Sequence, residues 1–125
     1  MENKIEILIN CIKKHLTPDL LKKQYRELNK NNSMFGHCYV ATESLYHLLN
    51  SKAYKPYYGK DENNITHWWL QDTMGTILDV TKEQYTSLNK KPPYLKGRKG
   101  AFLTLLPSKR SKILIARIND SKINK

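Results

Sequence analysis

Three residues whose types could carry nucleophilic catalysis follow one another along the chain: Cys38, His67 and Asp79. A cysteine attacks as its thiolate, a histidine can take up and return the proton, and a carboxylate can orient the imidazole. Cys38 stands directly before an apolar helical pattern, whereas His67 and Asp79 stand in segments with strand-like composition. The residue types and their order therefore predict a nucleophile, a general base that then acts as acid, and an orienting acid.

The helix expected at Cys38 spans about residues 37–49, where apolar residues recur at three- and four-residue intervals. Backbone N–H groups and the dipole at a helix N-terminus favour a thiolate, and the N–H of Cys38 is a candidate oxyanion donor. Gly36 permits a tight turn into the helix. A buried structural cysteine is the alternative interpretation of Cys38, and it is the interpretation we give to Cys11 in mid-helix.

The partners of the cysteine depend on strand register. Strand-like segments follow the helix at residues 54–58, 65–71 and 76–80, and they predict a small antiparallel sheet. If residues 73–75 form a three-residue hairpin loop, Trp69 lies opposite Asp79, and His67 and Asp79 project from one face as diagonal neighbours. A loop of two or four residues would put them on opposite faces and remove Asp79 from the site.

The other segments complete one α+β domain of 125 residues, in which N-terminal helices present the Cys38 helix to the sheet. They predict a helix ending near residue 15, a second at 17–28, a polar loop at 29–33, a short helix at 81–85, a turn-rich loop through 92–100, a strand at 102–106, a helix from 107 and a frayed tail at 121–125. A chain of this length needs no second domain.

Histidine and cysteine also bind metals, but the spacing does not favour that use. The sequence has no C-x-x-C, no H-x-x-x-H with an added ligand and no zinc-deaminase pattern. The glycines at 97 and 100 fit neither the phosphate-binding loop nor the dinucleotide-binding motif. We therefore expect no metal and no cofactor.

The net charge of +11 is concentrated in the C-terminal third. Residues 1–81 carry ten Lys or Arg against nine Asp or Glu, whereas residues 82–125 carry twelve against two. This segment predicts either a nucleic-acid-binding surface or a solubilising face. Lysine outnumbers arginine eighteen to four, and phosphate and base recognition usually draws on arginine, so we expect weak polyanion binding through residues 82–125.

The start of the chain lacks the features of an export signal, because acidic residues interrupt its apolar pattern. No stretch approaches the length of a membrane span. We therefore expect a cytoplasmic protein with both cysteines reduced and no membrane association.

Three blocks carry a resemblance to a known family: GHCYVAT at residues 36–42, THWWL at 66–70 and GTILDVTKEQY at 75–85. Together they resemble the YunG-like family of small bacterial and phage proteins, whose pattern is a G-x-C-x-V/A helix start, an S/T-H-x-W strand and a G-x-x-I/L-D-x-T-x-x-Q-aromatic segment. The tail, with PY at 93–94, GR at 97–98 and PSKR at 107–110, is similar to the phage members. The resemblance covers roughly residues 16–118.

The resemblance implies a papain-like or transglutaminase-like fold with Cys38, His67 and Asp79 in the site, and it names no substrate. We expect a cysteine-dependent hydrolase or acyl transferase acting on an amide, isopeptide or ester bond of a protein or small molecule. A phage host-takeover or defence-countering role in the host cytoplasm is the context that the phage members imply. The alternatives are a non-enzymatic basic nucleic-acid-binding module and a degenerate papain-like fold used for protein–protein interaction.

The chain departs from papain in having no glutamine shortly before the cysteine to complete an oxyanion hole. Gln24 and Tyr25 precede Cys38 by fourteen and thirteen residues, and both are candidates to fold over it. Arg98 is a candidate to bind an anionic group of the substrate, and a solvated loop position is its alternative interpretation.

Overall fold

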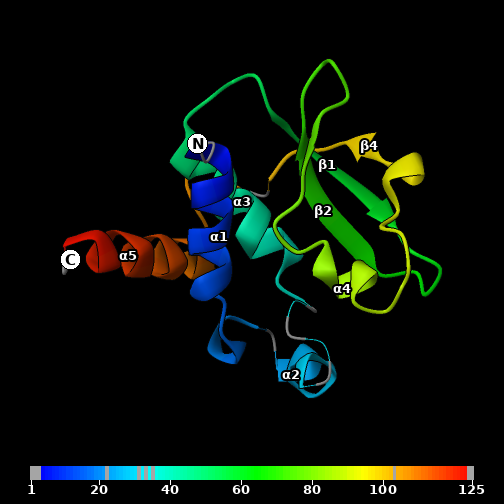
Figure 1. The fold of residues 1–125 in the computed structure, drawn as a ribbon, viewed down its shortest axis with the longest axis horizontal. Helices are drawn as coiled ribbons and strands as arrows, with labels where there is room; N and C mark the ends of the chain where they lie inside the picture. The colour runs from blue at the N-terminus through cyan, green and yellow to red at the C-terminus, as the bar shows by residue number, and fades with distance from the viewer. Residues whose placement is uncertain are drawn as a thin grey trace.

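Helices form one part of the molecule, and a sheet with a short helix forms the other (Figure 1). The computed structural model describes residues 4–21, 23–30, 32, 34, 36–102 and 104–123, with only the backbone of residues 24, 28, 122 and 123. The elements are α1 (Lys4–Lys14), the 3₁₀ helix η1 (Pro18–Leu20), α2 (Lys23–Asn29), α3 (Cys38–Leu49), β1 (Lys55–Lys60), β2 (Thr66–Gln71), β3 (Ile77–Leu78), α4 (Glu83–Thr86), the 3₁₀ helix η2 (Tyr94–Lys96), β4 (Arg98–Lys99) and α5 (Lys109–Ile123).

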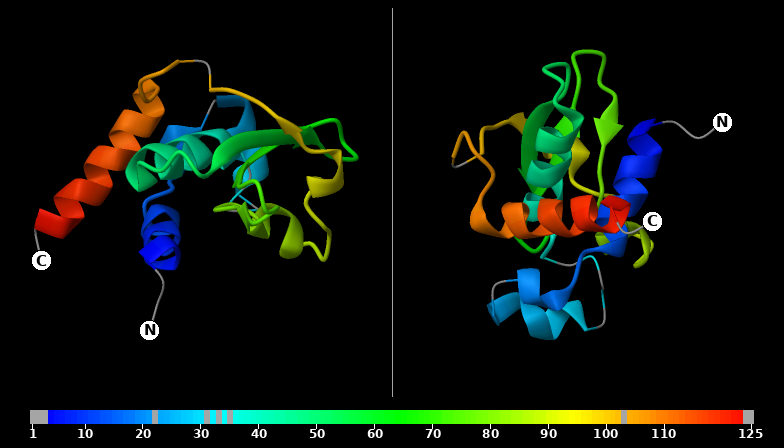
Figure 2. Two further views of the ribbon diagram at one scale, coloured as in Figure 1. Left: turned by 90° about the horizontal axis from the view of Figure 1, so that it is seen from above. Right: turned by 90° about the vertical axis from the view of Figure 1, so that its left-hand side faces the viewer.

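The strands form one antiparallel sheet in the order β3-β2-β1-β4. In Figures 1 and 2, α1, α3 and α5 lie at one end of the molecule, and the sheet with α4 lies at the other. Helix α3 joins the two parts, because it packs against β2 and also against α1 and α5. The chain is thus a single α+β domain in which Cys38 starts a helix packed on the sheet, as the sequence predicted.

The core lies where α3 meets its neighbours. Ile12 of α1, Leu45 of α3, Leu70 of β2 and Leu114 of α5 are all fully buried there. Large apolar side chains at such positions each contribute about 2–3 kcal/mol when removed from water. Helix α3 therefore owes its position to burial on two sides, and it ends at Asn50, which takes the left-handed conformation at φ 49°.

The hairpin between β2 and β3 has a three-residue loop, which is the one of the alternatives left open by the sequence that puts His67 and Asp79 on the same face. Leu70 pairs with Leu78, the N–H of Asp72 donates to Thr76 O at 3.1 Å, and Gly75 has φ 85°. The Asp72 carboxylate also accepts hydrogen bonds from the N–H groups of Met74 and Thr76, at 2.9 and 2.8 Å. An aspartate at the start and a glycine at the left-handed position fix this turn, and the turn fixes the register.

The helix expected at residues 17–28 is interrupted. Pro18 opens only the short η1, Leu21 is extended at φ −91° and ψ 150°, and α2 begins at Lys23. Leu20 and Leu21 are both buried. The extended conformation of Leu21 ends the 3₁₀ turn and separates it from α2.

The final strand is not where the sequence placed it. Within residues 102–106, position 103 lies outside the described residues and the others form no strand, so that prediction was wrong. The pairing falls instead on β4, where Arg98 lies opposite Tyr58. The ring of Phe102 packs against Tyr39 and Trp68, with centroids 5.6 and 5.9 Å apart, and this contact leads the chain away from the sheet edge.

The C-terminal helix α5 is longer than expected. It runs through Ile123, so residues 121–123 of the expected frayed tail are helical, while residues 124 and 125 lie outside the described part of the chain. Its first turn is held by Glu43, a buried carboxylate on α3 that accepts hydrogen bonds from the hydroxyls of Ser108 and Ser111, each at 2.6 Å. In the ranges that the structure describes, no helix is long and apolar enough to cross a membrane.

Candidate active site

Cys38 is the first residue of α3 and is 7% exposed. Its thiol donates a hydrogen bond to the backbone oxygen of Thr66 on β2, with the sulfur 3.6 Å away. Gly36 has φ 83°, and a Cβ there would lie 2.9 Å from Leu21 Cδ2 and 3.2 Å from Tyr25 Cβ. Only glycine fits this turn, so the turn brings the cysteine onto the strand that carries His67.

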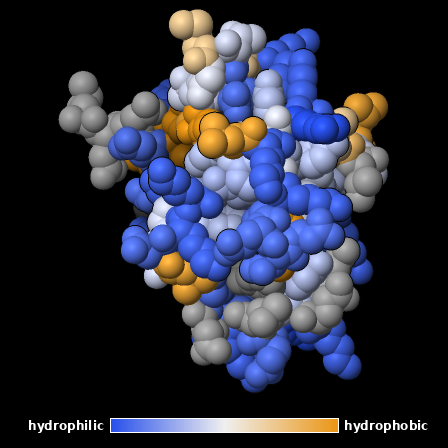
Figure 3. All heavy atoms as spheres, turned by 90° about the vertical axis from the view of Figure 1, so that its right-hand side faces the viewer, coloured by the Kyte–Doolittle hydropathy of each residue, from blue (hydrophilic) through white to orange (hydrophobic). Residues whose placement is uncertain are grey.

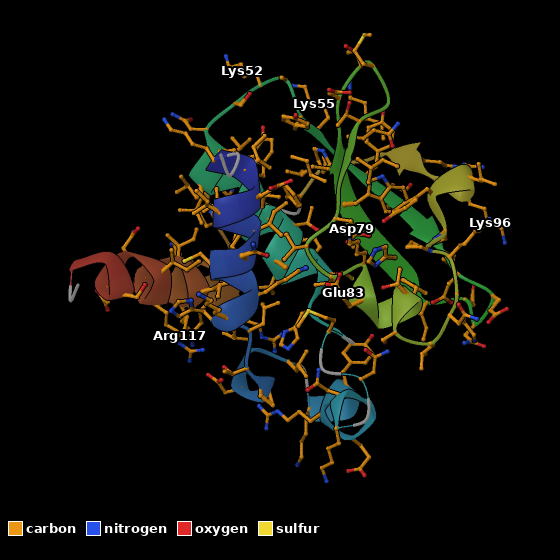
Figure 4. All side chains as sticks on the ribbon, in the orientation of Figure 1. Lys52, Lys55, Asp79, Glu83, Lys96 and Arg117 are labelled. Atoms are coloured by element: carbon orange, nitrogen blue, oxygen red, sulfur yellow. The ribbon has the colours of Figure 1, made fainter. Side chains whose placement is uncertain are left out.

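His67 and Asp79 form a buried pair (Figure 4 labels Asp79). His67 Nε2 donates to Asp79 Oδ2 at 2.6 Å, and the two side chains are 0% and 2% exposed. The expected geometry of diagonal neighbours on one face is therefore confirmed, because the three-residue loop places Trp69 opposite Asp79. A one-residue change of register would have separated them.

Two further donors hold the carboxylate of Asp79. The hydroxyl of Tyr94 donates to Oδ2 at 2.7 Å, and the N–H of Thr81 donates to Oδ1 at 3.1 Å. Both oxygens are thereby fixed in direction. Asp79 can orient His67 because it cannot itself rotate without losing these bonds.

The electrostatics of His67 favour its charged form. Burial, the largest influence, disfavours the imidazolium, but the hydrogen bond to Asp79, the interaction with Cys38 and the negative charge of Asp79 outweigh it and raise the pKa of His67 to about 9. Nδ1 is buried and makes no hydrogen bond within the described structure. Since Asp79 occupies Nε2, Nδ1 is the nitrogen left for the cysteine.

A second histidine directly precedes Cys38 in the chain, but its pKa is shifted in the opposite direction. His37 is 1% exposed, and neither ring nitrogen has a hydrogen-bond partner among the described residues. Burial lowers the pKa of His37 to about 4, although the charge of Asp19 opposes the change. His37 is therefore neutral at physiological pH, and His67 is the histidine suited to donate a proton.

Two tyrosines that sequence reasoning did not assign complete the surroundings of the pair. The ring of Tyr85 meets His67 edge to face, with centroids 4.9 Å apart, and its hydroxyl donates to Asp61 at 2.8 Å. Burial and the carboxylates that they meet raise the pKa of both Tyr85 and Tyr94, so both stay protonated donors. The signal available in the sequence was the aromatic residue of each of two motifs, at positions 85 and 94.

The sequence also suggested Tyr25, Gln24 and Arg98 as oxyanion or substrate-binding residues, and the structure places them differently. Tyr25 lies beside Gly36, and therefore close to the start of α3. The side chain of Gln24 lies outside the described residues. Arg98 is exposed on β4, with β1 between it and the strand of His67, so the fold does not bring it to Cys38.

Two cavities lie near the site, and neither is lined by Cys38. One of about 370 Å³ is bordered by Ile65 and Tyr85, and one of about 520 Å³ is bordered by Asp79 and Tyr94. His67 lines neither of them. Among the described residues, no three His, Cys, Asp or Glu side chains are grouped as a metal site would need.

Comparison of the chain with models of protein families, with curated proteins and with solved structures found no match in any of the three.

Proposed function

We propose that this protein is a cysteine-dependent hydrolase or acyl transferase acting on an amide, isopeptide or ester bond. One observation carries the proposal: the buried hydrogen bond of 2.6 Å between His67 Nε2 and Asp79 Oδ2, which leaves Nδ1 for Cys38. Acyl transfer through cysteine requires a nucleophile, a group that carries the proton and a group that orients this proton carrier. Cys38, His67 and Asp79 are proposed for these three roles.

In the proposed reaction the Cys38 thiolate attacks the carbonyl carbon, and the backbone N–H of Cys38 donates to the developing oxyanion. The imidazolium of His67 then gives its Nδ1 proton to the departing amine or alcohol, and a thioester remains on Cys38. In the second half, water or an acceptor amine attacks the thioester while His67 removes its proton. The intermediate then collapses by breaking the bond between the acyl carbon and the sulfur, and the acyl group leaves on the oxygen of the water or the nitrogen of the amine. The proton stays on Nδ1 of His67, which restores the starting pair of Cys38 thiolate and His67 imidazolium.

Each supporting residue has a distinct part. Asp79 stabilises the imidazolium and fixes its orientation through Nε2. Tyr94 and Thr81 keep Asp79 in place. Tyr25 and Gln24 remain proposals for a second oxyanion donor, with Tyr25 supported by its place beside Gly36.

The distribution of positive charge gives less support to the nucleic-acid-binding alternative. Helix α5 and the segment of η2 and β4 carry much of the charge of residues 82–125, and they lie at opposite ends of the molecule (Figures 1 and 2). A polyanion that met one end would leave the other unused. We propose only weak, salt-sensitive polyanion binding through these residues.

Alkylation by chloroacetamide tests the proposal, because Cys38, the cysteine proposed to be more reactive, is the less exposed of the two. Cys38 is buried and Cys11 is half-buried. An activated Cys38 should still be labelled faster at neutral pH, and His67→Ala should abolish this preference. Peptide mass spectrometry would follow both sites, with the urea-unfolded chain as the reference in which both react alike. Faster labelling of Cys11 in the folded protein would overturn the proposal.

A further inference from the structure

The cavity of about 370 Å³ adjoins the proposed active site through two of its wall residues. Tyr85 lines it and also contacts the ring of His67. Ile65 lines it and directly precedes Thr66, whose oxygen accepts the hydrogen bond from Cys38. The volume is within the range of small-molecule sites, so this cavity has the size and the position of a substrate subsite.

The rim of the cavity carries four lysines, at positions 60, 90, 91 and 96. Lys90 is neutralised by Glu62, with Nζ 2.5 Å from Oε1. No described carboxylate lies within ion-pair distance of Lys60, Lys91 or Lys96. Lys60, Lys91 and Lys96 therefore have no ion-pair partner among the described residues, and the wall holds four lysines against the two acids Asp61 and Glu62.

Asp61, the other acidic residue of the wall, already accepts hydrogen bonds from neighbouring residues. Asp61 Oδ1 accepts from the N–H groups of Asn63 and Ile65, at 2.8 and 3.0 Å, and Oδ2 accepts from the hydroxyl of Tyr85. Its carboxylate supports the turn between β1 and β2 rather than the lysines. The cavity as a whole thus presents an excess of positive charge to a ligand.

Apolar groups complete the wall, with Leu88 and Pro93 beside Ile65. Figure 4 shows Lys96 projecting from the edge of the molecule, and Figure 3 shows that this side is mostly hydrophilic with small hydrophobic interruptions. An apolar wall under a cationic rim fits a ligand with a short apolar body and an anionic end.

We propose that this cavity binds an anionic substituent, a carboxylate or a phosphate, of the acyl substrate whose carbonyl Cys38 attacks. The proposal rests on the proposed function for its reaction, but the binding of the anion does not. Lys60, Lys91 and Lys96 provide the charge, and Tyr85 separates the bound group from His67.

The test titrates the full-length protein with inorganic phosphate or succinate and follows backbone amide shifts by NMR. A triple variant, Lys60→Gln with Lys91→Gln and Lys96→Gln, is compared with an equal-charge control, Lys14→Gln with Lys109→Gln and Lys112→Gln, whose lysines are exposed on α1 and α5. We expect saturable shifts at Ile65 and Tyr85, and at least about a tenfold weaker Kd in the rim variant alone. The preferred anion identifies the substituent as phosphate or carboxylate.

Equal weakening in both triple variants, or no saturable shift at Ile65 and Tyr85, would overturn the proposal, because binding would then be adventitious attraction to a basic protein. Chloroacetamide labelling of Cys38 is measured on the same samples. Rim-dependent anion binding with an unreactive Cys38 would leave the cavity assignment standing and reject the proposed reaction. A reactive Cys38 without anion binding would reject the cavity assignment alone.

Discussion

Asp79 receives hydrogen bonds from His67, Tyr94 and the N–H of Thr81, and all three are donors. A carboxylate satisfies this set because it only accepts. An amide at the same position would present N–H₂ to one of the three. The three donors around position 79 therefore require a carboxylate, although an amide has nearly the same shape.

Asp79→Asn tests this at constant shape. The substitution should preserve the fold but misorient the imidazole, and turnover should fall by up to roughly 10⁴-fold, the scale of the equivalent change in a serine triad. Tyr94→Phe is the matched control, because it removes one donor to Asp79 and leaves His67 paired, so a loss of only about tenfold is expected. Chloroacetamide labelling of Cys38 and circular dichroism would measure reactivity and fold. Unchanged labelling in Asp79→Asn would reduce Asp79 to a structural acceptor.

The raised pKa of His67 also makes stability depend on pH. The folded pKa of about 9 lies above the ordinary value of 6.5, so the stabilisation is fully present below about pH 6.5 and is lost as pH rises through about 9. The free energy of unfolding should fall over this interval by on the order of 3 kcal/mol. Urea denaturation between pH 6 and about 10 measures it, with His67→Gln as the variant that removes the slope. A curve of the same slope in His67→Gln would contradict the assignment.

At this scale the sequence was informative about the three central residues and silent about those around them. Cys38, His67 and Asp79 were predicted from their residue types and their order, whereas the sequence left open the hairpin register that decides whether His67 and Asp79 meet. Tyr85 and Tyr94 come from a segment with no periodic pattern, so no rule of spacing leads from their positions to Asp79 or His67.

Among the elements, the β2–β3 hairpin determines the site. Inserting one glycine between Leu78 and Asp79 should leave the three-residue loop and the pairing of Leu70 with Leu78 in place and move Asp79 one position along the chain, to the other face. Selective labelling of Cys38 should then be lost while circular dichroism remains native. Gly75→Ala is the control, because its Cβ meets nothing within 4 Å and only the positive φ is strained, at about 1–2 kcal/mol, without a register change. Native labelling of the insertion variant would show that register does not govern the site.

The contact of Glu43 with the start of α5 is a second test at the scale of elements. Glu43→Ala removes the acceptor of the Ser108 hydroxyl and leaves the Ser111 hydroxyl only the longer bond to Val40 O at 3.4 Å, and we expect a loss of about 2–4 kcal/mol in the free energy of unfolding. Glu6→Ala, an exposed position on α1, should change it by less than about 0.5 kcal/mol. Chemical denaturation compares the two. Equal effects would mean that Glu43 does not hold α5.

Element prediction succeeded where local pattern and packing agree. The helix from Cys38 and the β2–β3 loop have strong local signals, a helical apolar stripe and a glycine with a preceding aspartate. The strand expected at residues 102–106 failed because Phe102 joins an aromatic cluster with Tyr39 and Trp68, a long-range contact that local β-propensity does not contain.

At the scale of the whole molecule, helix α3 connects a helical end with a sheet end, and the cysteine lies where they meet (Figure 1). The helical end supplies Cys38, the proposed nucleophile, and the sheet end supplies the imidazole of His67 and the carboxylate of Asp79. The arrangement depends on contacts distant in sequence, which explains why composition and charge alone left a binding module as an alternative.

The most direct measurement of the central claim is the detection of a covalent acyl group on Cys38. Mixing the protein with p-nitrophenyl acetate in a stopped-flow instrument, followed by acid quenching and peptide mass spectrometry, should give a stoichiometric burst of p-nitrophenolate and one acetyl group on the peptide that contains Cys38. Cys38→Ser and His67→Ala should lack both signals, whereas Cys11→Ser should retain them. An equal burst in Cys38→Ser, or acetyl groups found only on Cys11 and lysines, would contradict the assignment of Cys38 as the nucleophile.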